Sequence, residues 1–190
     1  MPYGSNLITN PSAETMDTTG WVVDNVTVEE NTTLETTYEH ILNDEDGWLG
    51  EYDHKLTVEG PAGDYAFIFA SDSDAYMTQI LYASDIGDQP ASFQFNCKFK
   101  IANAQDTWDP LVKGWAKLDI IYSDNSHDWF FIPFVKGLDH VNRNLFNFWL
   151  LVQNVCIVDA NKTLVSAEIK IETFDFGLKV DYIELRKEEE

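Results

Sequence analysis

The chain has 190 residues and a formal net charge of −21, from 33 Asp and Glu against 12 Lys and Arg. With 44% hydrophobic and 14% aromatic residues it is no disordered chain, because such chains lack this much buriable surface. Its charge repels nucleic acid phosphates and anionic membrane surfaces, so we expect no nucleic acid partner and a preference for neutral ligands or divalent cations.

Strand signals begin near the N-terminus and recur at short intervals. Segments rich in Val, Ile, Thr, Phe and Tyr favour strands. The clearest is 92–101, where apolar and polar residues alternate five times, which is the period of a strand and not of a helix. Before it, the same signals predict strands at residues 21–28, 35–41, 54–58, 65–69 and 76–82.

The second half of the chain continues this pattern. Pro133 places one strand near a sheet edge or a bulge, since proline cannot donate to an interior ladder. The segment 145–152 fits a helical stripe as well as a strand, and we favour the strand because its neighbours are strands. The other predicted strands are 116–122, 129–135, 168–172 and 180–185.

Turn signals separate these segments at regular spacing, for example at Gly60-Pro61 and at Ser123-Asp124-Asn125-Ser126. Short strands at such spacing predict an all-β sandwich with little helix. We expect a single domain over residues 1–186, followed by a charged C-terminal tail, 187–190, that frays. The sequence has no run of about 18 apolar residues, so we expect no membrane insertion.

The N-terminal sequence and the cysteines give weaker signals. The first ten residues have no basic segment followed by an apolar one, so we expect no classical signal peptide. Cys97 and Cys156 lack the spacing of metal ligands. Cys97 lies in an apolar row, which favours a buried free thiol. A disulfide across the sandwich is the alternative, and the sequence leaves that choice open.

The two ends of the chain carry the most specific pattern. Residues 6–14 read NLITNPSAE and are followed by Gly20-Trp21, and residues 180–185 read VDYIEL. This pattern resembles the carbohydrate-binding modules attached to xylanases and cellulases, within the galactose-binding-like jelly rolls. The resemblance implies a jelly-roll β-sandwich of two antiparallel sheets that binds a polysaccharide or other glycan without catalysis. Ser12-Ala13 stands where that family has Gly-Phe, and the Arg often seen after its third strand is absent here.

The closing strand holds an acidic residue among apolar ones. Because strand side chains alternate, Asp181 should share a face with Ile183 and Leu185 and be buried with them. A buried carboxylate is costly unless it is paired or binds a metal, and a structural Ca²⁺ ion would satisfy it. The alternative is a half-solvated Asp181 that pairs with Lys179 or Arg186.

The resemblance also implies co-ligands for such an ion. Modules of this kind join the closing Asp with a Glu from the opening motif and with another near the third strand. In this sequence those positions correspond to Glu14 and Glu51, and a backbone carbonyl at Ser12 would add to the shell. The ion would then tie the first strand to the last and would have a structural role.

Six tryptophans supply candidates for an aromatic binding platform. Trp48, Trp108 and Trp129 lie in polar sequence that predicts exposed turns, so we expect ligand contacts there. Trp21 and Trp149 lie in apolar patterns that predict the core.

A second candidate site is a polar sheet face. Jelly rolls of the resembled group bind ligands either on one face of a sheet or in loops at one edge. In the segment 92–101 the polar side carries Gln94 and Asn96, which would donate to and accept from sugar hydroxyls.

We expect no enzyme. The four histidines have no nucleophile context, and the sequence has no serine-hydrolase elbow, zinc-protease helix or phosphate-binding loop. Two functions then compete. The first is a carbohydrate-binding module. The second is a structural or adhesion protein of a virus, phage tail or cell surface that uses this fold in a homo-oligomer or larger assembly. Both imply an extracellular, cell-surface or virion-associated location.

Overall fold

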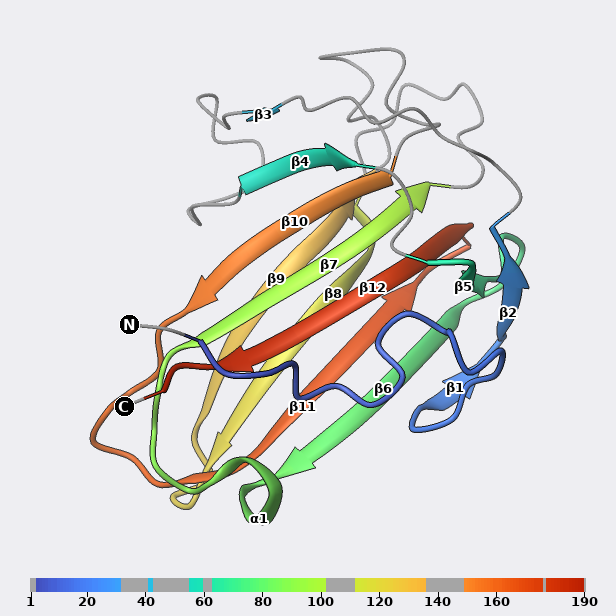
Figure 1. The fold of residues 1–190 in the computed structure, drawn as a ribbon. Coiled ribbons are helices and arrows are strands. Elements are labelled where there is room, and N and C mark those ends of the chain that lie inside the picture. Colours follow the sequence, from blue (N-terminus) through green and yellow to red (C-terminus); the bar gives the residue numbers. More distant parts are fainter. Residues whose placement is uncertain are drawn as a thin grey trace.

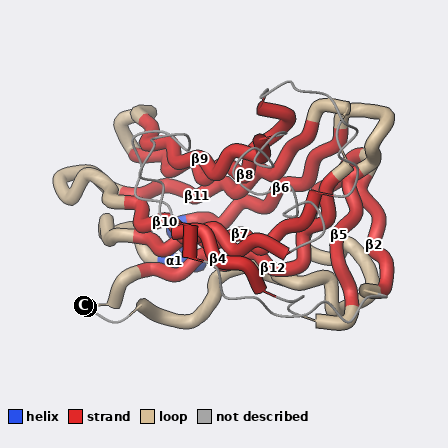
Figure 2. Tube along the Cα trace, turned by 90° about the horizontal axis from the view of Figure 1, so that it is seen from above, coloured by secondary structure: helices blue, strands red, loops and turns tan. Residues whose placement is uncertain are grey.

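The chain folds as a β-sandwich with one short helix, α1 (Ala83–Ile86), among the residues that the structure describes. Two antiparallel sheets stack face to face (Figure 1), and the view from above separates the two layers (Figure 2). The predicted jelly-roll fold class is therefore confirmed. No helix in the described part of the chain is long and apolar enough to cross a membrane. The computed structural model describes residues 3–31, 41–42, 55–59, 63–101, 112–135, 149–175 and 177–189.

The first sheet has five strands in the order β1-β6-β11-β8-β9. β9, which contains Pro133, lies at the edge of this sheet, one of the two positions predicted for it. Proline has no N–H to donate, and an edge strand has one side without a partner strand. The strands are β1 (Val22–Asp24), β6 (Ala75–Tyr82), β8 (Val112–Tyr122), β9 (His127–Val135) and β11 (Leu164–Thr173).

The second sheet has seven strands in the order β2-β5-β12-β7-β10-β4-β3. The ambiguous segment 145–152 is a strand from Trp149 onward, and the predicted strand 35–41 lies outside the described residues except for Ile41. The strands are β2 (Val26–Glu30), β3 (Ile41–Leu42), β4 (Lys55–Glu59), β5 (Tyr65–Phe69), β7 (Phe93–Ile101), β10 (Trp149–Cys156) and β12 (Leu178–Lys187).

The core fills the space between the two sheets. The alternation in β7 turns one side of that strand inward, and Phe99 packs edge-on against Phe134 of the opposite sheet at 4.7 Å between ring centroids. Trp21 is buried here, as predicted, and its ring lies 6.1 Å from that of Phe67. Burial of these large aromatic side chains supplies the main driving force for folding.

The predicted strand 21–28 is divided between the two sheets. Asn25 has a positive φ of 54°, and it separates β1 in one sheet from β2 in the other. Its side-chain amide donates to the carbonyl of Asp74 at 2.9 Å, and its carbonyl accepts from the Ala70 N–H at 3.1 Å. An asparagine tolerates this left-handed conformation better than most residues, so the chain changes sheet at this position.

Both cysteines are buried free thiols. Cys97 lies opposite Val152, whereas Cys156 lies opposite Phe93, four residues away along β7. Four residues of strand span about 13 Å, well beyond the Cα separation of a disulfide. The structure therefore rejects the disulfide alternative, and burial raises the pKa of both thiols.

The opening motif is held by hydrogen bonds to distant strands. The side chain of Asn6 donates to the carbonyl of Ile183 at 3.0 Å and accepts from the N–H of Leu185 at 3.0 Å. The buried Gln79 side chain exchanges hydrogen bonds with the backbone of Thr9 and also donates to the carbonyl of Gly20. These contacts join the opening motif to β12 and to β6.

The C-terminal end stays paired beyond Arg186. Lys187 is the last residue of β12, and its amino group donates to the carbonyl of Ile86 at 2.9 Å. Glu188 forms a β-bridge with Tyr3. Backbone pairing therefore continues to Glu188.

Candidate ligand-binding face

The outward side of the five-stranded sheet, called here the five-stranded face, combines aromatic rings with charged groups. In β8, Leu118 and Ile120 point into the core, so Lys117 and Asp119 point outward. The registers of the neighbouring strands align further outward side chains with them. The face includes Tyr76, Thr78, Trp115, Lys117, Asp119, His127, Trp129, Phe131, Glu168, Lys170 and Glu172.

Trp129 is the exposed aromatic residue of this face. It lies in β9, directly opposite Asp119 of β8, and 55% of its surface is exposed. The sequence placed Trp129 where a polar turn meets the predicted strand 129–135, and it is exposed as predicted. The strand begins two residues earlier than predicted, because His127 and Asp128 pair with β8 as well. The amino group of Lys117 lies 5.1 Å from the centroid of the Trp129 ring. A cation over an aromatic face is attracted by the ring and fixes its orientation.

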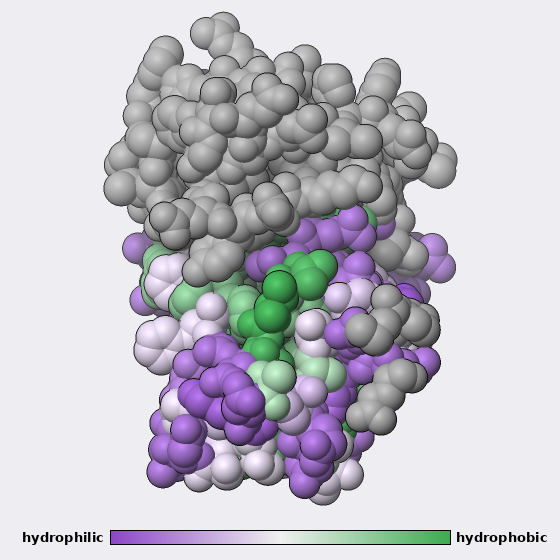
Figure 3. Space-filling model, turned by 90° about the vertical axis from the view of Figure 1, so that its left-hand side faces the viewer, coloured by the Kyte–Doolittle hydropathy of each residue, from purple (hydrophilic) through white to green (hydrophobic). Residues whose placement is uncertain are grey.

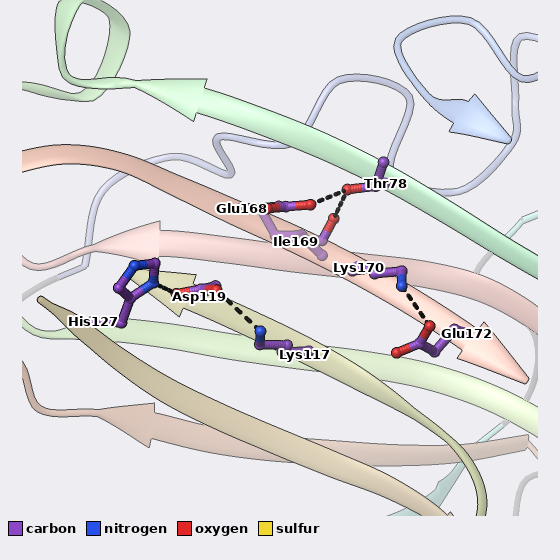
Figure 4. A network of polar contacts seen from close by, with 8 residues as sticks. All are labelled: Thr78, Lys117, Asp119, His127, Glu168, Ile169, Lys170 and Glu172. Carbon is purple, nitrogen blue, oxygen red and sulfur yellow. Dashed lines mark hydrogen bonds and ion pairs between the residues drawn. The ribbon is translucent and has the colours of Figure 1, made fainter. Parts of the chain in front are cut away.

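Asp119 joins two basic side chains next to this ring. One carboxylate oxygen accepts from the Lys117 amino group at 3.0 Å, and the other lies 2.8 Å from Nδ1 of His127 (Figure 4). The His127 ring in turn lies 6.0 Å from the Trp129 ring. These contacts restrict the rotamers around Trp129, so the ring is presented in a defined position.

A second group of the same kind lies on β11 and β6. The amino group of Lys170 donates to Glu172 at 2.5 Å and lies 5.5 Å from the centroid of the Tyr76 ring. Next to it, the Thr78 hydroxyl lies 3.0 Å from Glu168 Oε1 and 2.9 Å from the carbonyl of Ile169 (Figure 4). The five-stranded face therefore offers aromatic surface, amino donors and carboxylate acceptors together.

Sequence reasoning found Trp129 but missed the residues around it. The alternation in 116–122 already put Lys117 and Asp119 on the polar side of their strand. Which residues of β9 and β11 lie beside them depends on strand order and register, and no short-range pattern specifies those.

The outward side of the seven-stranded sheet, the seven-stranded face, carries the other predicted polar residues. Gln94 and Asn96 both point to this side. Asn96, however, is only 2% exposed, and its amide donates to Glu184 Oε2 at 2.5 Å. Trp149 is also buried, as predicted, but the register assigns it to this face and not to the core between the sheets.

Glu184 is the centre of a polar cluster on the seven-stranded face. Besides the Asn96 amide, it accepts from the hydroxyl of Tyr182 at 2.9 Å and pairs with the guanidinium of Arg186. Burial, followed by the hydrogen bond to Glu184, raises the pKa of Tyr182, and the bond to Glu184 raises the pKa of Arg186. The partners of this carboxylate are protein groups, which suits a structural role.

The predicted metal ligands Glu14 and Asp181 converge on one glycine. Oε1 of Glu14 accepts from the N–H of Tyr65 at 3.1 Å, and Oδ2 of Asp181 accepts from the N–H of Gly63 at 3.4 Å. A Cβ atom at Gly63 would lie 2.1 Å from Oε1 of Glu14, so a side chain at this position would displace the Glu14 carboxylate. The fold thus brings a residue of the opening motif and a residue of the closing strand to the same place.

Asp181 is fully buried, as the alternation with Ile183 and Leu185 predicted, but its strand is irregular at this point. A register shift between Val180 and Tyr182 makes it the extra residue of a β-bulge in β12. The bulge lets both Val180 and Asp181 point inward. The alternative of a half-solvated Asp181 is therefore wrong, and the Arg186 guanidinium, one of its two suggested partners, pairs with Glu184.

The remaining predicted site residues are Ser12, Glu51, Trp48 and Trp108. Ser12 is half-buried, and Trp48, Trp108 and Glu51 lie outside the described residues. Within the described ranges, no group of three or more His, Cys, Asp and Glu side chains is arranged to hold a metal ion.

The side of the molecule near the end of β10 has a different character. Figure 3 shows a narrow hydrophobic strip there between hydrophilic areas. Val155 and Ile157, at and just after the end of β10, are strongly exposed aliphatic residues. They offer no hydrogen-bonding groups on their side chains, so they do not suit a sugar.

Comparison with known proteins defines the fold. No protein-family model matches the chain, and no curated protein matches its sequence. Among solved structures, family 16 carbohydrate-binding module-2 is 14% identical, with 95% of this chain and 99% of that chain covered and a TM-score of 0.53. The CBM22-1 xylan-binding domain of Paenibacillus barcinonensis Xyn10C is 11% identical, with 98% and 97% covered and a TM-score of 0.52.

A third similar structure is the enzymatically active domain of tailspike protein 4 from bacteriophage CBA120. It is 16% identical, with a TM-score of 0.54, and the match covers 95% of this chain. The chain spans only 21% of that tailspike chain. At these identities the comparisons establish the fold: the chain has the β-sandwich fold of carbohydrate-binding modules.

Proposed function

We propose that the protein is a non-catalytic carbohydrate-binding module whose ligand, a polysaccharide or other glycan, lies on the five-stranded face. The observation that carries this proposal is the exposed ring of Trp129, held in a strand beside Lys117, Asp119 and His127. A sugar ring has an apolar face that stacks on an aromatic ring and a rim of hydroxyls that exchange hydrogen bonds with charged groups.

Charge and shape indicate the kind of ligand and the affinity. With a net charge of −21, the protein repels acidic polysaccharides at long range, so a neutral glycan is the preferred ligand. A sheet face is a shallow site that buries little area, so we expect a Kd of roughly 10–100 µM.

The test is binding to a set of soluble polysaccharides, namely xylan, mixed-linkage glucan, galactan and pectate, by affinity electrophoresis and calorimetry. At least one neutral polymer should bind, and Trp129→Ala should weaken binding at least about tenfold with little change in melting temperature. Val155→Ala, an exposed residue away from this face, is the control and should bind normally. An affinity that Trp129→Ala leaves unchanged would move the site elsewhere, and failure of every polymer to bind would refute the function.

The other predicted ligand residues lie in two places, in loops and on the seven-stranded face. Trp48 and Trp108 stay predictions for loops, to be tested by the same Ala substitutions and the same binding assays. Asn96 is buried and bonded to Glu184, so Gln94 is the better candidate on the seven-stranded face. If Trp129→Ala binds normally, Gln94→Ala is the next variant to measure.

A structural Ca²⁺ ion between Glu14 and Asp181 is the second part of the proposal. The donors fit, since two carboxylates meet at Gly63 and one of them is fully buried in a bulge of the last strand. Carboxylate and backbone oxygens are the ligands that Ca²⁺ prefers, and Ser12 and Glu51 are the proposed additional ligands. The ion would neutralise two like charges and join the opening motif to β12.

The metal proposal predicts a stability change. Because a bound ion stabilises only the native state, chelation should lower the melting temperature by about 5–10 °C, and added Ca²⁺ should restore it. Asp181→Asn should remove this response, whereas Glu29→Gln, an exposed acidic residue of β2, should keep it. A wild-type protein that melts at the same temperature in calcium and in chelator would contradict the proposal.

Assembly is the alternative function. Two observations favour it: the exposed aliphatic residues Val155 and Ile157, and the similarity to part of a phage tailspike. In that case the protein is a structural or adhesion component of a virion or cell surface. Light scattering would then show a homo-oligomer that Ile157→Asp disrupts, while Trp129→Ala leaves it intact. Either function fits an extracellular, cell-surface or virion-associated location.

A further inference from the structure

The centre of the five-stranded face carries two lysines directly opposite each other. Lys117 of β8 and Lys170 of β11 are paired residues in the antiparallel register. Like charges in this arrangement repel, and the chain has only 12 basic residues to place. Each lysine is compensated by an acidic residue two positions further along its own strand, Asp119 and Glu172 respectively (Figure 4).

This arrangement has a local two-fold axis. In an antiparallel pair, the axis passes between two directly opposite residues and exchanges the two strands. Rotation about the midpoint of Lys117 and Lys170 therefore moves the Lys117–Asp119 pair onto the Lys170–Glu172 pair.

Two aromatic residues, Trp129 and Tyr76, obey the same symmetry. Trp129 lies opposite Asp119 on one outer strand, and Tyr76 lies opposite Glu172 on the other. The lysine amino group lies 5.1 Å from the ring centroid in one case and 5.5 Å in the other. Each half of the face thus consists of an aromatic ring, the lysine over it and the carboxylate that holds this lysine.

We propose that these are two equivalent half-sites, which together bind one linear glycan chain by its internal units and accept that chain in either direction. The inference rests on the proposed function and specifies its ligand. Trp129 and Tyr76 are separated by three strand spacings and four residues, which corresponds to about 20 Å along the diagonal of the sheet. One sugar unit cannot reach both rings, so full affinity requires an oligosaccharide of several units.

Binding in both directions follows from the symmetry. A chain turned end for end meets the same groups in the same order: ring, lysine, lysine, ring. The half-sites differ in having Trp at one end and Tyr at the other, and in Phe131 and Thr78, which lie opposite Lys117 and Lys170 on the outer strands. They also differ in Trp115 and Glu168, whose positions the rotation exchanges. We expect these differences to leave the two directions within about tenfold of each other in population.

The first test uses oligosaccharides of two to six units, cut from whichever polymer the protein binds. Affinity should rise steeply with length, and Trp129→Ala and Tyr76→Ala should each weaken binding of the six-unit chain by roughly tenfold. Tyr82→Ala is the matched control, because Tyr82 is exposed on the same face but lies outside both half-sites. Equal affinity for the two-unit and six-unit chains would overturn the inference while leaving the proposed function intact.

The second test measures direction with a nitroxide label at the reducing end of the six-unit chain. Paramagnetic broadening should appear at both ends of the face, near Trp129 and near Tyr76. The Trp129→Tyr variant, which makes the two rings identical, should bring the two populations closer to equal. Broadening at one end only, in both proteins, would refute binding in both directions. If no polymer binds at all, the proposed function fails and this inference fails with it.

Discussion

The two outward faces of the sandwich have similar polar patterns but differ in how exposed their tryptophans are. The five-stranded face presents Trp129 with more than half of its surface exposed, and its ion pairs lie at the solvent boundary. On the seven-stranded face, Asn96, Glu184 and Trp149 are buried. Alternation along a strand therefore identifies an outward side chain, but it does not tell whether that side chain is accessible to a ligand. Polar groups that bind each other in a buried cluster serve the fold, whereas groups beside an exposed ring are available for recognition.

The largest expected difference between the two faces is in the unfolding free energy lost when a tryptophan of each face is replaced by alanine. Trp149→Ala should cost about 3–5 kcal/mol of unfolding free energy, because it empties a buried position. Trp129→Ala should cost less than about 1 kcal/mol, because the ring is exposed and loses mainly the lysine contact. Urea denaturation of both variants measures this difference, and similar losses would mean that exposure does not separate the faces.

Two glutamates give the next contrast. Glu184→Gln should destabilise the protein by about 1–3 kcal/mol, because a buried acceptor of three donors loses its charge. Glu168→Gln, on the five-stranded face, should cost under about 1 kcal/mol, because Glu168 is only partly buried. Denaturation at neutral pH compares the two variants. A larger loss for Glu168→Gln would reverse the assignment of structural and recognition faces.

The smallest effect concerns alkaline pH and Tyr122 at the end of β8. Burial, and then the hydrogen bond to Asp128, raise the pKa of this phenol above its usual value of 10.0. The unfolded chain loses the proton first, so this contribution to stability is complete below pH 10.0 and declines as the pH rises above it. Denaturation gives the free energy of unfolding at pH 8 and at pH 11. The fall in this free energy between the two pH values should be smaller for Tyr122→Phe than for the wild type. Tyr82→Phe, at an exposed tyrosine, should leave that difference unchanged.

Much of this arrangement could be predicted from local pattern. The alternation in 92–101 and the β-branched and aromatic segments predicted strands because period two places one side of each strand in the core. The same reasoning put Trp21 in the core and Asp181 on a buried face. The division of 21–28 between two sheets was not predictable, since it depends on the backbone conformation of Asn25 and on hydrogen bonds to residues about fifty positions away.

The sequence by itself determined the class of fold and the polar or apolar character of each side of each strand, and it limited the strand with Pro133 to an edge or a bulge. Tertiary structure alone decided which outward residues are buried and which are exposed, and it alone aligned Lys117 with Lys170 and Asp119 with Trp129. The physical reason is that hydrophobic periodicity acts within a strand, whereas register and sheet order arise from packing between strands that are remote in sequence. The convergence of Glu14 and Asp181 on Gly63 has the same origin, because a bulge and two chain ends must meet before those carboxylates share a site.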